Sequence, residues 1–298
     1  MAFNAYQLTS NGGKSILIWI IGIEETFESQ RILQELKDSD LEYRFLSWKD
    51  ITLPLIKVPD LCVFRTPAGL RGLYIPYMLS VMEELERQGC KTIPSSHALY
   101  KCDKLSTYLL WKKHLKDYIK MPEAICTVNL DVALEFLKER QVAVFKPIIG
   151  GRGIGIELIR ENEEEILKEL HKKHGILYLQ EFIPNPGYDI RTLVIGEEIA
   201  SQYARYNPEE FRHNLFQGAT PLTIKETMEI DMNVEEYVKQ SKELAFKVKE
   251  LFSLEMFAID TLPSTEKQLY FLEVNALFGF KGPKENIAKM IVDHLRKY

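Results

Sequence analysis

Short apolar runs alternate with amphipathic stretches over the first third of the chain. Four apolar runs predict strands, at residues 16–23, 43–48, 61–64 and 91–94. Two amphipathic stretches predict helices, at residues 26–37 and 74–88. Gly89 directly follows the second stretch, as glycine often does at the end of a helix. Strands that alternate with helices are typical of a parallel sheet, so a small parallel α/β unit is expected over residues 14–97.

The pattern changes after residue 100, where strands follow one another more often. Helices are expected at about residues 103–115, 129–140, 161–173, 234–251 and 283–296. Strands are expected at residues 142–147, 155–160, 176–183, 190–196, 198–206, 256–262 and 268–275. The last two are separated only by the turn-rich "PSTEK", which predicts a β-hairpin. The fold class is therefore α/β followed by α+β, while the first 13 residues lack periodicity and predict a loose lead-in.

The composition is that of a soluble globular protein: 298 residues, 46% hydrophobic and 27% charged. A net charge of −5 provides no overall basic field, so no nucleic-acid partner is expected. The early apolar run at 16–23 is far shorter than the roughly 20 residues of a membrane span, and no cleavage site follows it. We therefore expect a cytoplasmic protein without a membrane partner.

The four cysteines and six histidines are scattered along the chain. No CxxC pair occurs, and no cysteine lies near a histidine at metal-ligand spacing; the cysteines are Cys62, Cys90, Cys102 and Cys126. Reduced thiols are expected, and neither a histidine-based metal site nor a catalytic triad is predicted.

The final strand, "LYFLEVN", is apolar except for Glu273 and Asn275. Residues two apart in a strand point to the same face, and the predicted hairpin places Asp260 across from them. Two carboxylates and an amide oxygen suit Mg²⁺ or Mn²⁺, and a bridging carboxylate could serve two ions about 4 Å apart. The alternative is an edge strand with solvated polar residues.

The loop "KPIIGGRGIGI" carries Gly150, Gly151 and Gly153 among its four glycines. It joins two predicted strands, whereas the Rossmann and Walker loops lead into a helix. We interpret it as a hairpin flap over a nucleotide, with an ordinary tight turn as the alternative. "GGKS" at residues 12–15 lacks the upstream glycine and precedes a strand, so it is not a phosphate-binding loop.

Two lysines and one glutamate extend this nucleotide hypothesis. Lys146 shares a strand face with apolar side chains, and Lys104 lies in the first turn of a helix, where a cation is disfavoured unless an anion is near. Glu181 ends an apolar strand and could accept from adenine or ribose, with the backbone of Phe182 and Ile183 beside adenine. The alternatives are solvated surface lysines and a polar strand end.

Three arginines lie between these elements and the carboxylates. Arg191 and Arg205 fall on successive strands, and Arg212 begins "RHN" with His213 and Asn214. Because guanidinium groups bind carboxylate and phosphate in a bidentate manner, an anionic site is expected here. The alternative is a set of ordinary salt bridges, with His213 exposed and without a role.

In this order the motifs "DKLST", "VFKPIIGGRGIGI", "LQEFI", "GYDIRTLVIG", "FRHN", "FAID" and "YFLEVNA" resemble the ATP-grasp superfamily. The resemblance is to RimK-like amino-acid ligases, above all the glutamate-adding ligases of archaeal coenzymes. It covers residues 100–282 and implies an ATP-grasp fold behind an N-terminal parallel α/β domain. The implied boundaries are 1–99 for that domain, 100–183 for a central subdomain with the flap and 184–298 for a C-terminal subdomain with the metal site.

The resemblance also implies roles. ATP would contact Lys104, Lys146, Gly150, Gly151, Gly153, Glu181, Phe182, Ile183, Asp189, Arg212, His213 and Asn214. Two Mg²⁺ or Mn²⁺ ions would bind Asp260, Glu273 and Asn275. Arg191, Arg205 and Arg212 are the catalytic candidates, since they would hold a substrate carboxylate or the developing anion.

The implied reaction joins a carboxylate and an amine through an acyl phosphate, without a covalent protein nucleophile. It implies L-glutamate as the amino acid added and a coenzyme or a peptide as acceptor. Two alternatives keep the fold: a regulatory protein that binds nucleotide without ligation, and an ATP-grasp kinase. The sequence leaves open whether the chain forms a homo-oligomer.

The chain departs from the family pattern at two places. "NALFGFKG" replaces the usual small-residue-and-proline turn after the metal strand, and introduces Phe278 and Phe280. These rings could stack on an aromatic acceptor or simply belong to the core. Gln217 stands where many relatives carry a basic residue. Both departures leave the acceptor undetermined.

Overall fold

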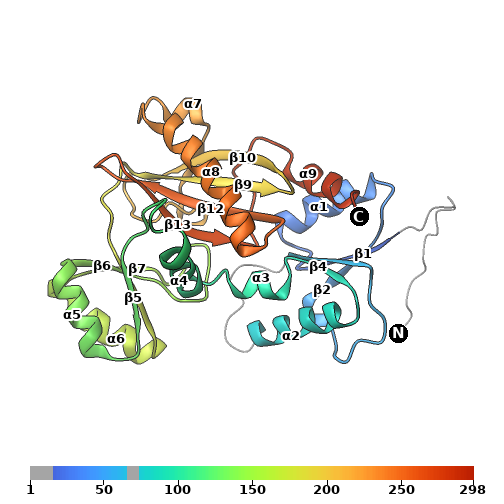
Figure 1. Cartoon of the computed structure of the whole chain (residues 1–298), viewed down its shortest axis with the longest axis horizontal. Helices are drawn as coiled ribbons and strands as arrows, with labels where there is room; N and C mark the ends of the chain where they lie inside the picture. Colours follow the sequence, from blue (N-terminus) through green and yellow to red (C-terminus); the bar gives the residue numbers. More distant parts are fainter. Residues whose placement is uncertain (1–15, 66–73) are drawn as a thin grey trace.

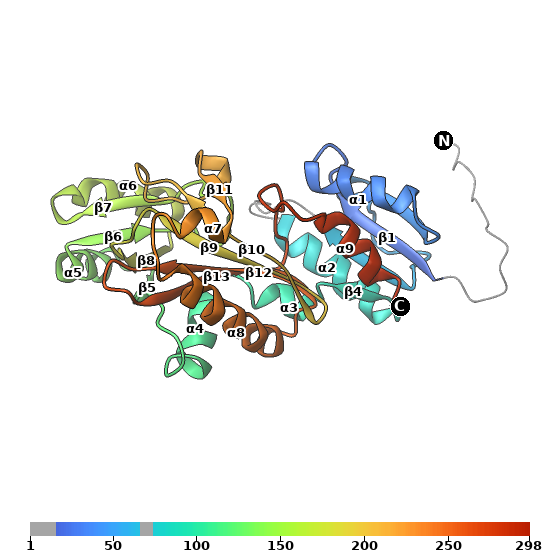
Figure 2. The ribbon, with the colours of Figure 1, turned by 90° about the horizontal axis from the view of Figure 1, so that it is seen from above.

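Three sheets organise residues 16–65 and 74–298, which are the parts that the computed structural model describes. The first sheet lies at one end of an elongated molecule, the second at the other end and the third between them (Figures 1 and 2). The mixed parallel and antiparallel architecture agrees with the expected fold class. The predictions for the lead-in and for "GGKS" lie outside the described residues, and the three domain boundaries stay predictions.

The first sheet is parallel and has the strand order β2-β1-β3-β4. Its strands are β1 (Leu17–Gly22), β2 (Glu42–Ser47), β3 (Leu61–Arg65) and β4 (Lys91–Ile93). Its helices are α1 (Phe27–Lys37) and α2 (Tyr74–Arg87). The alternating pattern over residues 14–97 therefore predicted this unit correctly.

The second sheet is antiparallel and has the order β5-β8-β6-β7. Its strands are β5 (Ala124–Thr127), β6 (Val142–Phe145), β7 (Glu157–Arg160) and β8 (Leu177–Glu181), with helices α5 (Leu130–Arg140) and α6 (Glu164–His174). As predicted, the glycine-rich loop joins a hairpin, β6–β7. Strand β5 was not expected, because four residues are too short to show a period.

The third sheet has the order β11-β10-β9-β12-β13. Its strands are β9 (Tyr188–Ile195), β10 (Glu198–Tyr206), β11 (Thr220–Leu222), β12 (Met256–Pro263) and β13 (Leu269–Asn275). Helix α8 (Val234–Phe252) covers one face, because its buried residues recur every three or four positions: Val234, Tyr237, Ser241, Leu244, Ala245, Val248 and Phe252. The face of the third sheet opposite α8 is therefore available for a functional site.

The remaining helices connect these units: α3 (Ser96–Tyr100), α4 (Lys104–His114), α7 (Ile224–Thr227) and α9 (Ile287–Leu295). Among the described residues, three short 3₁₀ turns occur, at Trp48–Asp50, Glu161–Glu163 and Leu215–Gln217. Helix α9 begins later than predicted because the Asn286 side chain caps it by accepting from the Lys289 N–H. No helix of the described parts is both long and apolar enough to span a bilayer.

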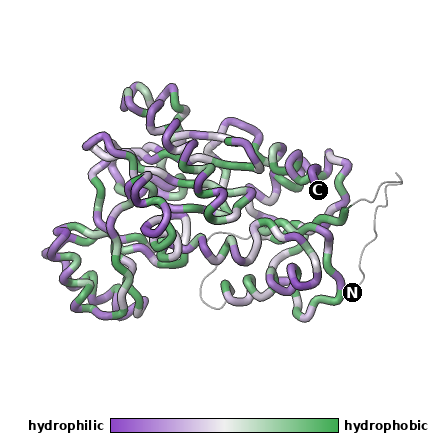
Figure 3. Tube along the Cα trace, in the orientation of Figure 1, coloured by the Kyte–Doolittle hydropathy of each residue, from purple (hydrophilic) through white to green (hydrophobic). Residues whose placement is uncertain are grey.

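Helix α9, near the end of the chain, lies beside α1 in the first unit (Figures 1 and 2). Its apolar residues share one buried cluster with Ile18 and Ile20 of β1 and with Leu193 and Met256 of the third sheet. Figure 3 shows hydrophobic segments running along the strands and hydrophilic segments along the outer turns. The cluster therefore fixes the first sheet against part of the face of the third sheet that α8 does not cover.

Candidate active site

A β-bulge decides where the polar residues of β13 point. Asp260 pairs with Glu273, whereas the next residue of β12, Thr261, pairs with Phe271, so Leu272 is extra. Phe271 and Val274 consequently both face the core beneath α8, while Leu272 and Glu273 line a pocket on the other side. The bulge explains how polar residues can follow an apolar strand without entering its core.

A row of paired residues crosses the third sheet on the face opposite α8. Tyr203 of β10 pairs with Arg191 of β9, Arg191 pairs with Asp260 of β12, and Asp260 pairs with Glu273 of β13. Directly paired residues project to the same face, so these side chains meet. Asn275 joins them, since its Nδ2 donates to Glu273 at 3.2 Å and to Asp260 at 3.4 Å. The predicted meeting of Asp260, Glu273 and Asn275 is confirmed.

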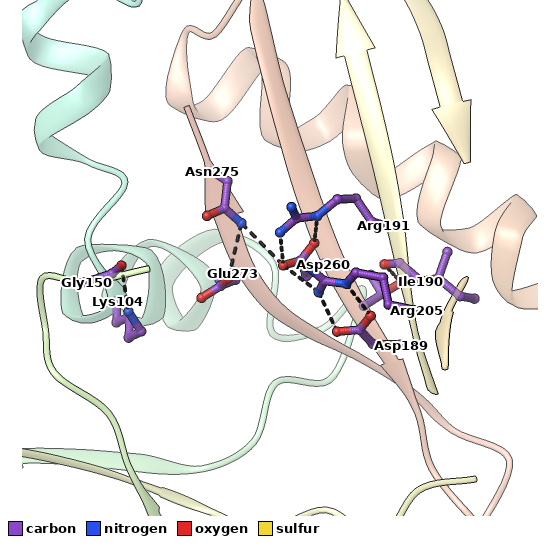
Figure 4. A network of polar contacts seen from close by, with 10 residues as sticks. Lys104, Gly150, Asp189, Ile190, Arg191, Arg205, Asp260, Glu273 and Asn275 are labelled. Carbon is purple, nitrogen blue, oxygen red and sulfur yellow. Dashed lines mark hydrogen bonds and ion pairs between the residues drawn. The ribbon is translucent and has the colours of Figure 1, made fainter. Parts of the chain in front are cut away.

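Arginines neutralise one of the two carboxylates, as Figure 4 shows. Arg191 donates from Nε and Nη2 to the two oxygens of Asp260, both at 2.7 Å. Arg205 donates to both oxygens of Asp189, at 2.7 and 2.5 Å, and its Nη2 also lies 2.9 Å from Asp260. In this structure both arginines form salt bridges, in agreement with the alternative given above. Their predicted contact with substrate stays a prediction.

These pairs set the charge of Asp260, which is only 1% exposed. Burial alone raises the pKa of a carboxyl group, but the guanidinium groups of Arg191 and Arg205 outweigh it and hold the pKa of Asp260 well below its usual range. Asp260 is therefore a carboxylate at neutral pH. Glu273 has no ion pair with any lysine or arginine in the described parts of the chain, and the Asn275 amide is its hydrogen-bond partner.

The donor set fits a hard divalent cation. Two carboxylates and one amide oxygen on adjoining strands are the ligands that Mg²⁺ takes in proteins, with water and phosphate completing six. Within residues 16–65 and 74–298, no three His, Cys, Asp or Glu side chains gather at metal-binding spacing. A metal here would consequently depend on the carbonyl oxygen of Asn275 together with the carboxylates of Asp260 and Glu273.

The pocket above this row brings most predicted site residues together. Its lining includes Lys104, Lys146, Gly150, Gly151, Gly153, Glu181, Phe182, Ile183, Asp189, Arg205, Arg212, His213, Asn214, Asp260 and Glu273. Arg191 and Asn275 are not in this lining and contact it through Asp260. The glycine flap from β6–β7 borders the pocket on the side of the second sheet. The pocket thus lies between the second and third sheets.

The two predicted lysines lie close to the flap. Lys104 begins α4, and its Nζ donates to the Gly150 carbonyl at 3.5 Å. Lys146 donates from Nζ to Gln180 Oε1 at 2.5 Å, and burial lowers the pKa of Lys146 to about 8. Gln180, which is buried, was not predicted as a site residue, although a polar residue inside the apolar run "LYLQE" was a usable signal. Both ammonium groups therefore face the pocket rather than bulk solvent.

The end of β8 supplies the other predicted contacts. One oxygen of Glu181 accepts from the Glu123 N–H at 3.0 Å, and the other lies 3.2 Å from Arg140. The ladder between β8 and β6 ends at Glu181, so the backbone groups of Phe182 and Ile183 follow its last pair. Glu181 is thus held in place from outside the pocket, and its contact with a nucleotide stays a prediction.

Buried nitrogen atoms without partners line the far side of the pocket. His213 is 5% exposed, so the exposed alternative is wrong, and burial lowers its pKa. Arg212 donates to Glu210 at 2.7 Å. Within the described residues, Arg212 Nε and His213 Nε2 have no hydrogen-bond partner. Because unsatisfied buried polar groups are costly, these atoms fit a polar ligand such as a nucleotide phosphate.

Phe278 and Phe280 belong to the core. They are 2% and 5% exposed and share the buried cluster that joins the first and third sheets. The guanidinium of Arg65, at the end of β3, lies 4.8 Å from the Phe278 ring centroid and donates to the Phe278 carbonyl. The core alternative for both rings is therefore correct, and neither ring is available for stacking on an acceptor.

Comparison with known proteins agrees with this geometry. A family model described as the RimK-like ATP-grasp domain matches residues 102–295. The chain is 29% identical over 289 residues to a glutamate–LysW ligase, ArgX, of Sulfurisphaera tokodaii, covering 91% of this chain and 94% of the relative. It is also 29% identical over 162 residues to a tetrahydromethanopterin:alpha-L-glutamate ligase of Methanosarcina acetivorans, covering 49% of each chain.

A solved structure shares the fold at low sequence identity. The ATP-grasp ligase PsnB, complexed with a variant of its minimal precursor, Mg and ADP, superposes with a TM-score of 0.67 at 15% identity, covering 94% of this chain and 97% of that one. The family model spans more than half of the chain. The expected resemblance is thus confirmed: the protein belongs to the RimK-like ATP-grasp family and is an ATP-dependent ligase.

Proposed function

We propose that the protein adds L-glutamate to a small-molecule or peptide acceptor by joining a carboxylate to an amine. The observation that carries this proposal is the meeting of Asp260, Glu273 and Asn275 beneath a pocket with two lysines and a glycine flap. The names of two relatives, glutamate–LysW ligase and tetrahydromethanopterin:alpha-L-glutamate ligase, support glutamate as the amino acid added.

ATP activates the carboxylate first. A carboxylate oxygen attacks the γ-phosphorus, the bond to the β-phosphate oxygen breaks, and ADP leaves an acyl phosphate behind. Lys104 and Lys146 would hold the phosphates, and the unpartnered nitrogens of Arg212 and His213 offer further donors. Asn214 and Asp189 border the same pocket. Positioning and charge neutralisation would supply most of the rate enhancement.

The amine then completes the amide. Its nitrogen attacks the acyl carbon, the carbon–oxygen bond to phosphate breaks, phosphate leaves and the nitrogen loses a proton to solvent. Arg191 and Arg205 are the candidates for stabilising the tetrahedral anion, once a substrate anion competes with Asp260 for them. No covalent intermediate on the protein is part of this route.

Mg²⁺ or Mn²⁺, as two ions, completes the proposed site. When bound, the ions would neutralise phosphate charge. Asp260, Glu273 and Asn275 would hold them, and the two arginines keep Asp260 ionised for that purpose. We place this activity in the cytoplasm, which the four free thiols support because disulfides are rare there.

Phosphate release from ATP tests the function. Purified protein with Mg²⁺ is given a panel of carboxylates and amines, singly and in pairs. Release that requires both partners supports ligation, with the amide identified by mass spectrometry. A phosphorylated product that forms without any amine would support the kinase alternative. ATP binding without release under any pairing would support the regulatory alternative.

A further inference from the structure

The glycine flap contacts a loop of the third sheet on the far side of the pocket. Gly153 has a φ of +70°, and a Cβ placed there would come within 2.6 Å of Asn214 Oδ1 and 3.1 Å of Gln217 Cγ. Only glycine allows both this backbone conformation and this approach. The flap and the loop therefore touch closely at Gly153.

Two side chains of the same loop contact the neighbouring flap residue. Gln217 donates from Nε2 to the Arg152 carbonyl at 3.2 Å. The Arg152 guanidinium lies 5.7 Å from the ring centroid of Phe216, within the range of a cation–π contact. Arg152 itself has a φ of +61°, which is uncommon for a residue with a side chain. These contacts help to maintain the flap backbone in this unfavourable conformation.

The loop can act as a fixed support because its own hydrogen bonds define it. Gln217 belongs to a 3₁₀ turn whose Gln217 N–H donates to the Asn214 carbonyl at 2.8 Å. The Asn207 side chain donates to the Gln217 carbonyl at 3.4 Å. Gly153 and Asn214 line the pocket, whereas Phe216 and Gln217 lie outside it. The contacts thus bridge the second and third sheets, and Phe216 and Gln217 make them from outside the pocket lining.

We propose that Phe216 and Gln217 are positioning residues that hold the flap closed over bound nucleotide; we call them the flap dock. The proposal rests on the proposed function in one respect, namely that the pocket binds ATP. The dock slows nucleotide release because the flap must leave Gln217 and Phe216 before it opens. It also gives a role to Gln217, which the sequence marked only as a departure from the family.

Nucleotide release tests the dock directly. Protein loaded with Mg²⁺ and a fluorescent methylanthraniloyl-ATP is mixed with excess ATP in a stopped-flow instrument. Gln217→Glu keeps the size of the side chain and removes its donor, so the dissociation rate should rise about three- to tenfold. Phe216→Ala should raise it about two- to fivefold. Gln217→Lys retains a donor and should stay within about twofold of the wild type.

The matched control is Gln240→Ala on the exposed side of α8, which should change nothing. Thermal unfolding midpoints of all variants should match the wild type, since Phe216 is exposed and Gln217 is half-buried. Wild-type release rates in both Gln217→Glu and Phe216→Ala would overturn the dock alone. Failure of the wild type to bind the analogue would overturn the proposed function as well.

A second measurement needs no nucleotide. Trypsin cleaves after arginine, and Arg152 is exposed within the flap. Limited digestion of the nucleotide-free protein should yield fragments 1–152 and 153–298 about three- to tenfold faster in Gln217→Glu than in the wild type. Equal cleavage rates after Arg152 would contradict the dock whatever ligand the pocket takes.

Discussion

The Arg191 guanidinium and the Asp260 carboxylate lie on paired positions of adjoining strands and share two hydrogen bonds of 2.7 Å. Arg205 reaches the same carboxylate at 2.9 Å, whereas Glu273, across the other side, is paired with no cation among the described residues. The two carboxylates therefore differ. Asp260 is oriented and neutralised by arginines, whereas Glu273 accepts a hydrogen bond from the Asn275 amide.

Glu273→Ala should abolish most turnover and preserve the fold. The change removes the unpaired carboxylate of the proposed metal set, so kcat should fall by about 10²–10³-fold or more. Phosphate release at saturating ATP and Mg²⁺ measures the loss, and circular dichroism checks the fold. Glu266→Ala, in the exposed turn between β12 and β13, is the matched control. Near-normal turnover of Glu273→Ala with Mg²⁺ would contradict the metal assignment.

Asp189→Ala should act on stability. Both oxygens of Asp189 bind Arg205, which is buried, so the variant leaves a buried guanidinium with one carboxylate fewer. Breaking a buried ion pair costs about 3–5 kcal/mol, to be read from urea unfolding. Asp40→Ala breaks an exposed pair with Arg296 and should cost less than about 1 kcal/mol. Equal losses in the two variants would argue against the buried network.

Nucleotide affinity should fall as pH rises above about 8. Burial lowers the pKa of free Lys146 to about 8, and a bound phosphate would raise it because it favours the charged form. Just above pH 8 the complex therefore holds more protons than the free protein, so nucleotide binding takes up a proton and the affinity falls with rising pH. Below pH 8 both forms are protonated at Lys146, and the affinity stays level.

Isothermal titration calorimetry at pH 7, 8 and 9, in two buffers of different ionisation enthalpy, measures the affinity and the proton uptake together. Lys146→Met should bind more weakly at pH 7 and lose the decline between pH 8 and 9. An affinity that strengthens over that interval in the wild type would rule out this role for Lys146.

Gly282→Ala should destabilise the protein. A Cβ at Gly282 would overlap the ring of Tyr203, which is buried and pairs with Arg191 in the third sheet. Forcing an extra methyl group into a packed core costs about 1–3 kcal/mol. Gly150→Ala is the control, because the described atom nearest to a Cβ there belongs to Pro147, at an ordinary contact distance of 3.7 Å. Urea unfolding should separate the two variants, and a Gly282→Ala protein as stable as the wild type would refute the packing.

The pairing of Asp260 with Glu273 could be predicted because the hairpin is local in sequence and its turn is recognisable. The bulge at Leu272 could not be predicted, because one extra residue does not change the pattern of an apolar run. The hydrogen-bond partner of the Arg191 side chain could not be predicted from the sequence either. Arg191 and Asp260 lie 69 positions apart, and the register of their strands depends on packing rather than on any nearby motif.

Local signals explain the other differences. The sequence predicts too early a start for the last helix because proline favours the first turn and Pro283 precedes the run, whereas Asn286 carries the capping side chain. Strand β11 was missed because three residues that include Pro221 do not resemble a strand. The glycine flap could be recognised because its glycines lie between two short apolar runs, whereas its contact with Gln217 depends on the arrangement of two sheets.

The position of α9 has a consequence for synthesis of the chain. Strand β1 is synthesised well before α9, but the cluster that covers it includes Ile287, Ile291 and Leu295 of that helix. A nascent chain therefore carries an incompletely covered first sheet until α9 has been made. Truncation of the chain ahead of Ile287 would expose apolar surface on β1, which is far away in the sequence, and such products should aggregate rather than merely lose a helix.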